Sequence, residues 1–129
     1  MKFLKTTLVF AIFILCTTNV VAQSNILSQR PVLTDEEEVS AAVTKEIDEV
    51  FQSADFLKKK NKKYADIKGT MVIDIGVVQN GKVSSFFKVD SDIKNIDFIN
   101  FMSDYILQHK FQFKLQKQQR YKIRYTATF

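Results

Sequence analysis

The last nine residues alternate strictly between apolar and polar side chains, and this pattern constrains the fold more than any other. One face collects the apolar residues Tyr121, Ile123, Tyr125, Ala127 and Phe129. A period of two predicts a half-buried β-strand that closes the sequence. A final strand of this kind can leave a free sheet edge, which is able to accept a strand from another protein.

The first 22 residues have the pattern of a secretory signal peptide. Lys2 and Lys5 precede an apolar run from Leu8 to Cys16, and small residues suited to cleavage follow at Val20 to Ala22. The apolar run is interrupted after nine residues, whereas a membrane-spanning helix needs about 20. We therefore expect an exported mature protein that does not span the membrane. The periplasm is the expected location, and secretion is the alternative.

Cys16 is the only cysteine and falls inside the predicted signal peptide. A lipid anchor there is disfavoured because Leu15, rather than a small residue, precedes it. Cleavage near Ala22 would leave no cysteine, which excludes disulfides and cysteine metal sites. The rest of the chain is predicted to form a flexible lead-in at residues 23–33 and a single α+β domain at residues 34–129.

The first part of this domain predicts an amphipathic helix from Asp35 to Leu57. Thr34 and Glu37 have the spacing of a capping box, and acidic residues at 35–38 suit the positive end of a helix. We expect one apolar stripe at helical spacing to pack on a sheet. Its members are Val39, Val43, Ile47, Val50, Ala54 and Leu57.

Residues 69–90 predict a β-hairpin around the turn from Gln79 to Gly81. A two-residue Asn-Gly turn would place the apolar rows of the two strands on opposite faces. A three-residue loop places both rows on one face, and we prefer it because burial sets register. Gly81 then takes the left-handed position. The expected pairs are Val77 with Val83, Ile75 with Ser85, and Ile73 with Phe87.

A second helix is predicted from Ile96 to Lys110, because apolar residues recur there at helical spacing. A short extended stretch from Phe111 to Leu115 and a polar turn precede the last strand. The order is therefore helix, strand, strand, helix, strand. It predicts an α+β fold in which a small antiparallel sheet has helices packed on one face.

The sequence contains no set of residues that predicts catalysis, a cofactor or a metal site. The single histidine, His109, is expected at a helix end, where the helix dipole favours its charge. Asp90 and Asp92 resemble the start of a calcium loop but lack the glycine and final glutamate that such a loop needs. We therefore expect a binding or structural protein, not an enzyme.

The basic residues gather towards the C-terminus, in a chain of formal net charge +5. Six of them follow Tyr105, and no acidic residue does. An exported protein seldom meets nucleic acid, so we expect no nucleic-acid partner. A solvated strand face explains the charge most simply, and an anionic surface such as lipid or polysaccharide is the sharper alternative.

Five motifs follow one another between Gly69 and Phe129. They are a GTMVIDIGV strand, a QNGKV turn, a VDSD break, a helix ending in HKFQF, and the alternating last strand. Together they resemble the C-terminal domain of the TonB family, the periplasmic energy transducers. The resemblance implies binding of an envelope or outer-membrane protein by strand addition. The candidate edge strand is Tyr121, Lys122, Ile123, Arg124, Tyr125, Thr126, Ala127 and Thr128.

The chain also differs from that family. Its transducers have an uncleaved membrane anchor and a long proline-rich spacer, whereas this sequence predicts a signal peptide and has one proline, Pro31. The sequence thus favours a stand-alone exported module. The alternative is a structural, self-associating envelope protein, a homodimer joined through its sheet edges with no client.

Overall fold

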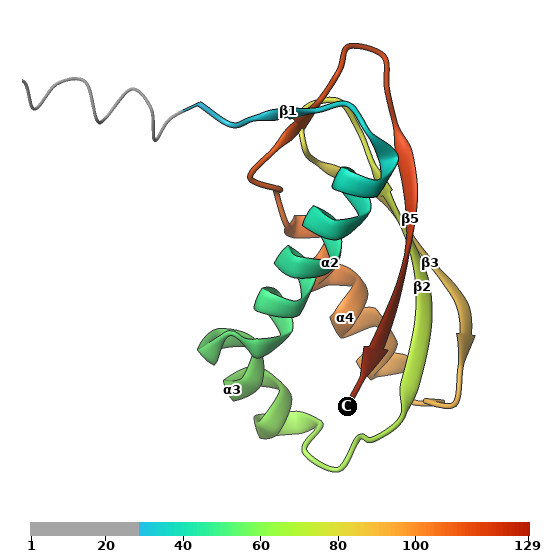
Figure 1. The fold of residues 1–129 in the computed structure, drawn as a ribbon. Helices are drawn as coiled ribbons and strands as arrows, with labels where there is room; N and C mark the ends of the chain where they lie inside the picture. Colours follow the sequence, from blue (N-terminus) through green and yellow to red (C-terminus); the bar gives the residue numbers. More distant parts are fainter. Residues whose placement is uncertain (1–28) are drawn as a thin grey trace, which may run out of the picture.

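The computed structural model describes residues 29–129, so the predicted signal peptide, Cys16 and most of the predicted lead-in lie outside the described residues. The described residues form three helices and five strands, whose arrangement Figure 1 shows. They are β1 (Val32–Leu33), α2 (Glu36–Gln52), α3 (Ala54–Lys63), β2 (Thr70–Val77), β3 (Val83–Ser91), α4 (Ile96–Gln108), β4 (Lys114–Leu115) and β5 (Tyr121–Thr128).

The main sheet is antiparallel and has the strand order β3-β2-β5, so β2 is central and the other two strands are edges. All three helices lie on one face of this sheet, with α2 packed against β5 and α4 against β3 (Figure 1). The α+β fold expected from the sequence is confirmed. The core fills the space between the helices and the sheet, with Phe56, Phe98 and Phe111 fully buried.

The predicted helix from Asp35 to Leu57 is wrong, because the chain forms two helices with a break at Ser53. This residue is extended, and its Oγ accepts a hydrogen bond from the Phe56 backbone N–H at 3.2 Å. Its own hydroxyl donates to the Val50 carbonyl at 2.7 Å. Ser53 thus ends α2 and caps α3.

The break changes which side chains reach the core. Phe51 and Phe56 are buried on either side of it, whereas Leu57 remains 42% exposed. Two phenylalanines bury more apolar surface than the predicted Ala54 and Leu57 would, which favours the change of direction.

The predicted capping box at the start of the first helix is also wrong. Asp35, not Thr34, is the N-cap, and no side chain caps the helix there. The acidic residues Glu36 to Glu38 do occupy the first turn, where the helix dipole favours them. Thr34 lies outside α2, and its carbonyl accepts a hydrogen bond from the Tyr121 hydroxyl at 3.3 Å.

The hairpin loop has the three residues that the sequence predicts. Val77 pairs with Val83, the Gly81 N–H donates to the Val78 carbonyl at 2.9 Å, and Gly81 has φ 82°. A side chain at Gly81 would also collide with the Phe113 carbonyl oxygen. Glycine is therefore required here both by its backbone angle and by the space available.

The other two predicted pairs of the hairpin are wrong, because β3 contains a bulge directly after Val83. Ser85 lies opposite Gly76, Phe86 opposite Ile75 and Phe87 opposite Asp74. One extra residue on the bulged strand moves the side chains that follow it, up to the second register shift near Val72, to the other face. As a result, Phe86 packs against the core and Phe87 is 65% exposed.

Two short strands lie beside the hairpin loop, and the sequence did not predict the first of them, β1. β1 pairs in parallel with β4, which falls within the predicted extended stretch from Phe111 to Leu115. The Arg30 guanidinium donates to the carbonyls of Asn80 and Phe111, each at 2.9 Å. The described end of the predicted lead-in is therefore bound to the fold.

Candidate functional site: the free edge of β5

The hydrogen bonds at the end of β5 establish which of its backbone groups are free. Gly69 and Phe129 exchange two hydrogen bonds: the Gly69 N–H donates to the Phe129 carbonyl at 3.2 Å, and the Phe129 N–H donates to the Gly69 carbonyl at 2.9 Å. Facing residues of an antiparallel pair alternate between bonded and unbonded pairs. Tyr121, Ile123, Tyr125 and Ala127 therefore bond to β2. The N–H and C=O groups of the intervening residues point away from the sheet, and these residues are Lys122, Arg124, Thr126 and Thr128.

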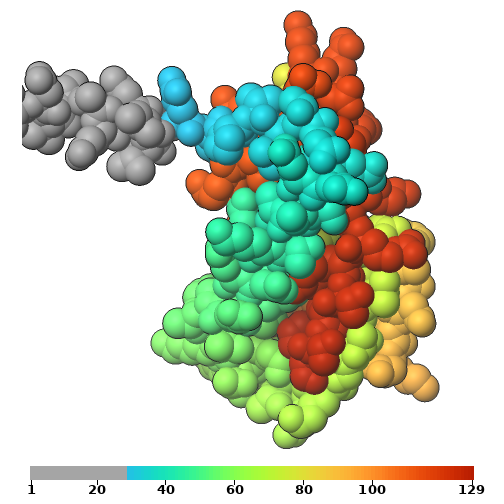
Figure 2. Space-filling model, viewed as in Figure 1, coloured from blue at the N-terminus to red at the C-terminus, as the bar shows by residue number. Residues whose placement is uncertain are grey.

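The two edges of the sheet differ in regularity. β5 pairs with β2 over eight residues without a register shift, and its atoms form an exposed band beside the helices (Figure 2). β3 has register irregularities near both ends of its pairing with β2. Bulges twist an edge and interrupt further pairing. Only β5 therefore offers a straight edge among the strands of this sheet.

The structure divides the eight predicted edge residues into two groups. Ile123, Tyr125 and Ala127 belong to the core, and Tyr121 is partly buried against it. The four residues with outward backbone groups have exposed side chains on the face opposite the helices. The strand is at an edge as predicted, and its role in binding stays a prediction.

Arg124 is held against the sheet by Asp74 of β2. Its Nε donates to Asp74 Oδ1 at 3.0 Å and its Nη2 donates to Oδ2 at 3.2 Å. These hydrogen bonds lower the pKa of Asp74 and raise the pKa of Arg124. The guanidinium thus lies over β2 instead of extending past the edge.

A groove of about 440 Å³ runs beside the C-terminal half of β5. Its walls come from β5 and from the helices α2 and α3. The lining residues are Asp48, Phe51, Gln52, Leu57, Lys60, Tyr125, Thr126, Thr128 and Phe129. Sequence reasoning missed this groove because the single predicted helix would not have placed α3 beside β5.

The two ends of the groove differ in charge. At one end the Tyr125 hydroxyl donates to Asp48 Oδ1. Burial raises the pKa of Tyr125, and the bond to Asp48 raises it further, so this hydroxyl stays protonated. At the other end lies Lys60, which is only 8% exposed.

Lys60 is a lysine with few polar contacts. Its Nζ donates to the Tyr64 carbonyl at 3.3 Å and lies 5.9 Å and 5.7 Å from the ring centroids of Phe98 and Phe129. None of the ion pairs found within residues 29–129 includes it. An ammonium group has three donors, so Lys60 has capacity for a further acceptor. The sequence feature that could have indicated the position of Lys60 is Ser53, because Ser53 caps α3, the helix that carries Lys60.

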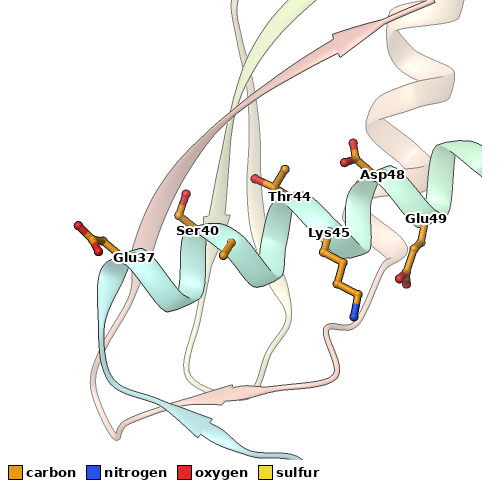
Figure 3. A pocket seen from close by; sticks show the side chains of 7 residues that line it. Glu37, Ser40, Thr44, Lys45, Asp48 and Glu49 are labelled. Carbon is orange, nitrogen blue, oxygen red and sulfur yellow. The ribbon is translucent and has the colours of Figure 1, made fainter.

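A larger hollow of about 700 Å³ lies on the outer side of α2 (Figure 3). All its lining residues come from this one helix, and among them are Glu37, Ser40, Thr44 and Asp48. A single helix cannot enclose a ligand, so this surface is open to solvent. It meets the groove at Asp48, which lines both.

The other predicted polar residues make structural contacts. His109 Nε2 lies 3.0 Å from Glu46 Oε1, which joins the end of α4 to α2. Asp92 Oδ1 accepts from the Thr70 N–H at 2.7 Å, and Asp90 Oδ1 from the Ser91 N–H at 2.9 Å. Both aspartates therefore shape the end of β3 and the loop that follows it.

In the part of the chain that the structure describes, no group of three His, Cys, Asp or Glu side chains is placed to hold a metal ion. Within residues 29–129, no helix has the length and apolar character needed to cross a membrane. Comparison with models of protein families, with curated proteins and with solved structures finds no significant match for this chain. The TonB resemblance therefore stays a prediction that rests on the sequence motifs.

Proposed function

We propose that this domain binds an extended segment of another protein by adding it as a strand along β5. The observation that carries the proposal is the straight outer edge of this strand, which keeps one register over eight residues and pairs with no other strand of residues 29–129. Lys122, Arg124, Thr126 and Thr128 direct their backbone donors and acceptors to that edge. In strand addition, such groups supply much of the affinity and alternate side chains supply selectivity.

The proposed partner is an envelope or outer-membrane protein. The predicted signal peptide and the likeness to the TonB C-terminal domain support this choice. Edge charges normally discourage strand pairing, but Asp74 holds Arg124 over β2. This contact leaves the middle of the edge accessible.

Thr126→Pro tests the proposal without disturbing the sheet. The Thr126 N–H points outward, so proline removes a donor for the partner and no hydrogen bond to β2. Proline is tolerated on edge strands at such positions. Thr126→Val is the matched control, because it changes the side chain and keeps the N–H.

The assay is selection of displayed peptides of about nine residues, the length of a long strand, on the purified protein. Peptides selected on the wild type should bind Thr126→Val normally and bind Thr126→Pro at least about tenfold more weakly. Circular dichroism establishes that each variant is folded. Equal binding by a folded Thr126→Pro protein would contradict strand addition at β5. Capture from crosslinked envelope extract with the same variants then identifies the natural partner.

The same edge is also suited to pairing between two copies of β5, the structural alternative. Sedimentation of the purified protein separates the two functions. A dimer that Thr126→Pro converts to a monomer would favour self-association. A monomeric wild type that binds selected peptides would favour a client protein.

A further inference from the structure

We propose that the groove beside β5 selects partner segments with an acidic side chain two residues from an apolar one, the carboxylate pairing with Lys60. This inference rests on the proposed strand addition and specifies the chemistry of the segment. Two observations support it: the side chains of an added strand would alternate between the two faces of the sheet, and the groove on one of these faces has a lysine at one end and apolar residues at its centre.

Side chains of an added strand would alternate between the two faces of the sheet. Those opposite Thr126 and Thr128 would lie on the open face. Those opposite Tyr125, Ala127 and Phe129 would point to the helix side, where the groove lies. Consecutive groove positions are therefore two residues apart along the partner.

The middle of the groove suits an apolar side chain. On this face of β5 the Phe51 ring lies 6.0 Å from the Tyr125 ring and 5.6 Å from the Phe129 ring, and Ala127 between them is buried, so the floor here is apolar. Phe51 and Leu57 form the opposite wall. Leu57 is 42% exposed in the free protein, and a partner side chain opposite Ala127 would cover it.

The end of the groove at Phe129 suits a carboxylate. The Lys60 ammonium is close to the Phe129 ring, has one hydrogen bond and has no ion pair with any of the described residues. A buried charge without a counterion is costly, and a hydrogen-bonded acid offsets that cost.

The opposite end of the groove does not suit an acid. Asp48 lies there and already accepts the Tyr125 hydroxyl, so a second carboxylate would be repelled. The groove thus has a direction: the acid belongs opposite Phe129, and the apolar residue opposite Ala127.

The experiment uses the same displayed peptides on the wild type, Lys60→Met and Lys62→Met. Methionine keeps an apolar stem and removes the charge, and Lys62 is an exposed lysine of the same helix. Peptides selected on the wild type should be enriched in Asp or Glu two positions from an apolar residue. The enrichment should disappear with Lys60→Met and remain with Lys62→Met.

Binding of one selected peptide then measures the contact directly. Replacing its acid by the matching amide should weaken binding to the wild type about tenfold. The same replacement should leave binding to Lys60→Met nearly unchanged, because the partner charge is already absent.

The outcomes separate this inference from the proposed function. If no peptide is selected, or if selected peptides bind folded Thr126→Pro as well as the wild type, strand addition at β5 is refuted. If binding needs the Thr126 N–H but the peptides show no acidic preference, or keep it with Lys60→Met, only the role of Lys60 is refuted.

Discussion

The break at Ser53 predicts that two neighbouring residues of α3 contribute very differently to stability. Phe56 is fully buried, and its ring centroid lies 4.9 Å from that of Phe51, 5.4 Å from Phe101 and 5.2 Å from Tyr105. Leu57 is 42% exposed. One continuous helix would instead direct Leu57 into the core.

The stability that each variant should lose follows from how much surface the side chain buries. A phenylalanine buries about 150–250 Å², which corresponds to about 4–6 kcal/mol at about 25 cal/mol per Å². Measured Phe→Ala changes in cores cost about 3–5 kcal/mol. Leu57 loses far less surface contact on truncation, so Leu57→Ala should cost at most about 1 kcal/mol.

Urea unfolding followed by circular dichroism measures both free energies. With a slope of about 1.5 kcal/mol per M, Phe56→Ala should lower the midpoint by about 2–3 M and Leu57→Ala by less than about 0.7 M. The total free energy of unfolding of a small domain is only about 5–15 kcal/mol, so Phe56→Ala could prevent folding. Phe56→Leu is a milder variant that should lose an intermediate amount of stability. A Leu57→Ala variant that is as unstable as Phe56→Ala would refute the two-helix arrangement.

Two further predictions concern the sheet. Asp74→Asn removes a carboxylate whose pKa is lowered from 3.8 by Arg124. The Asp74–Arg124 pair stabilises the fold above pH 3.8, the ordinary pKa of the aspartate. This stability is lost as the pH falls through the lowered pKa of Asp74 in the folded protein. The urea midpoints of wild type and Asp74→Asn should therefore differ near neutral pH and converge below about pH 4; divergence in acid would contradict the pairing. Gly81→Ala should cost at least about 1 kcal/mol, because φ is 82° and the new Cβ would meet the Phe113 carbonyl oxygen. An unchanged melting temperature would exclude this turn geometry.

Elements with strong local signals were predictable from the sequence. The period of two from Tyr121 to Phe129 identified β5: Ile123, Tyr125 and Ala127 belong to the core, and Tyr121 and Phe129 pack against it. The three-residue loop was predicted because it places the apolar rows of both strands on one face, and Gly81 takes the left-handed angle expected there. The helix from Ile96 was predicted with an end at Lys110, and it ends at Gln108. Each of these features depends on neighbours in the chain and needs little tertiary information.

The bulge in β3 was not predictable in this way. Alternation placed Phe87 in the core, but Phe86 takes that position. Either phenylalanine satisfies the local pattern, and a bulge adds only one unpaired residue. The choice is made by how β3 fits against β2 and α4.

The candidate site shows the same division. By itself the sequence determined that the last residues form a strand with one apolar and one polar face. Only the tertiary structure decided that this strand lies at a straight edge, with its free backbone groups on Lys122, Arg124, Thr126 and Thr128. It also decided that the break at Ser53 brings Lys60 to a groove beside that edge. Side-chain periodicity is a local property, whereas strand order and the direction of α3 depend on which distant surfaces bury the most apolar area together.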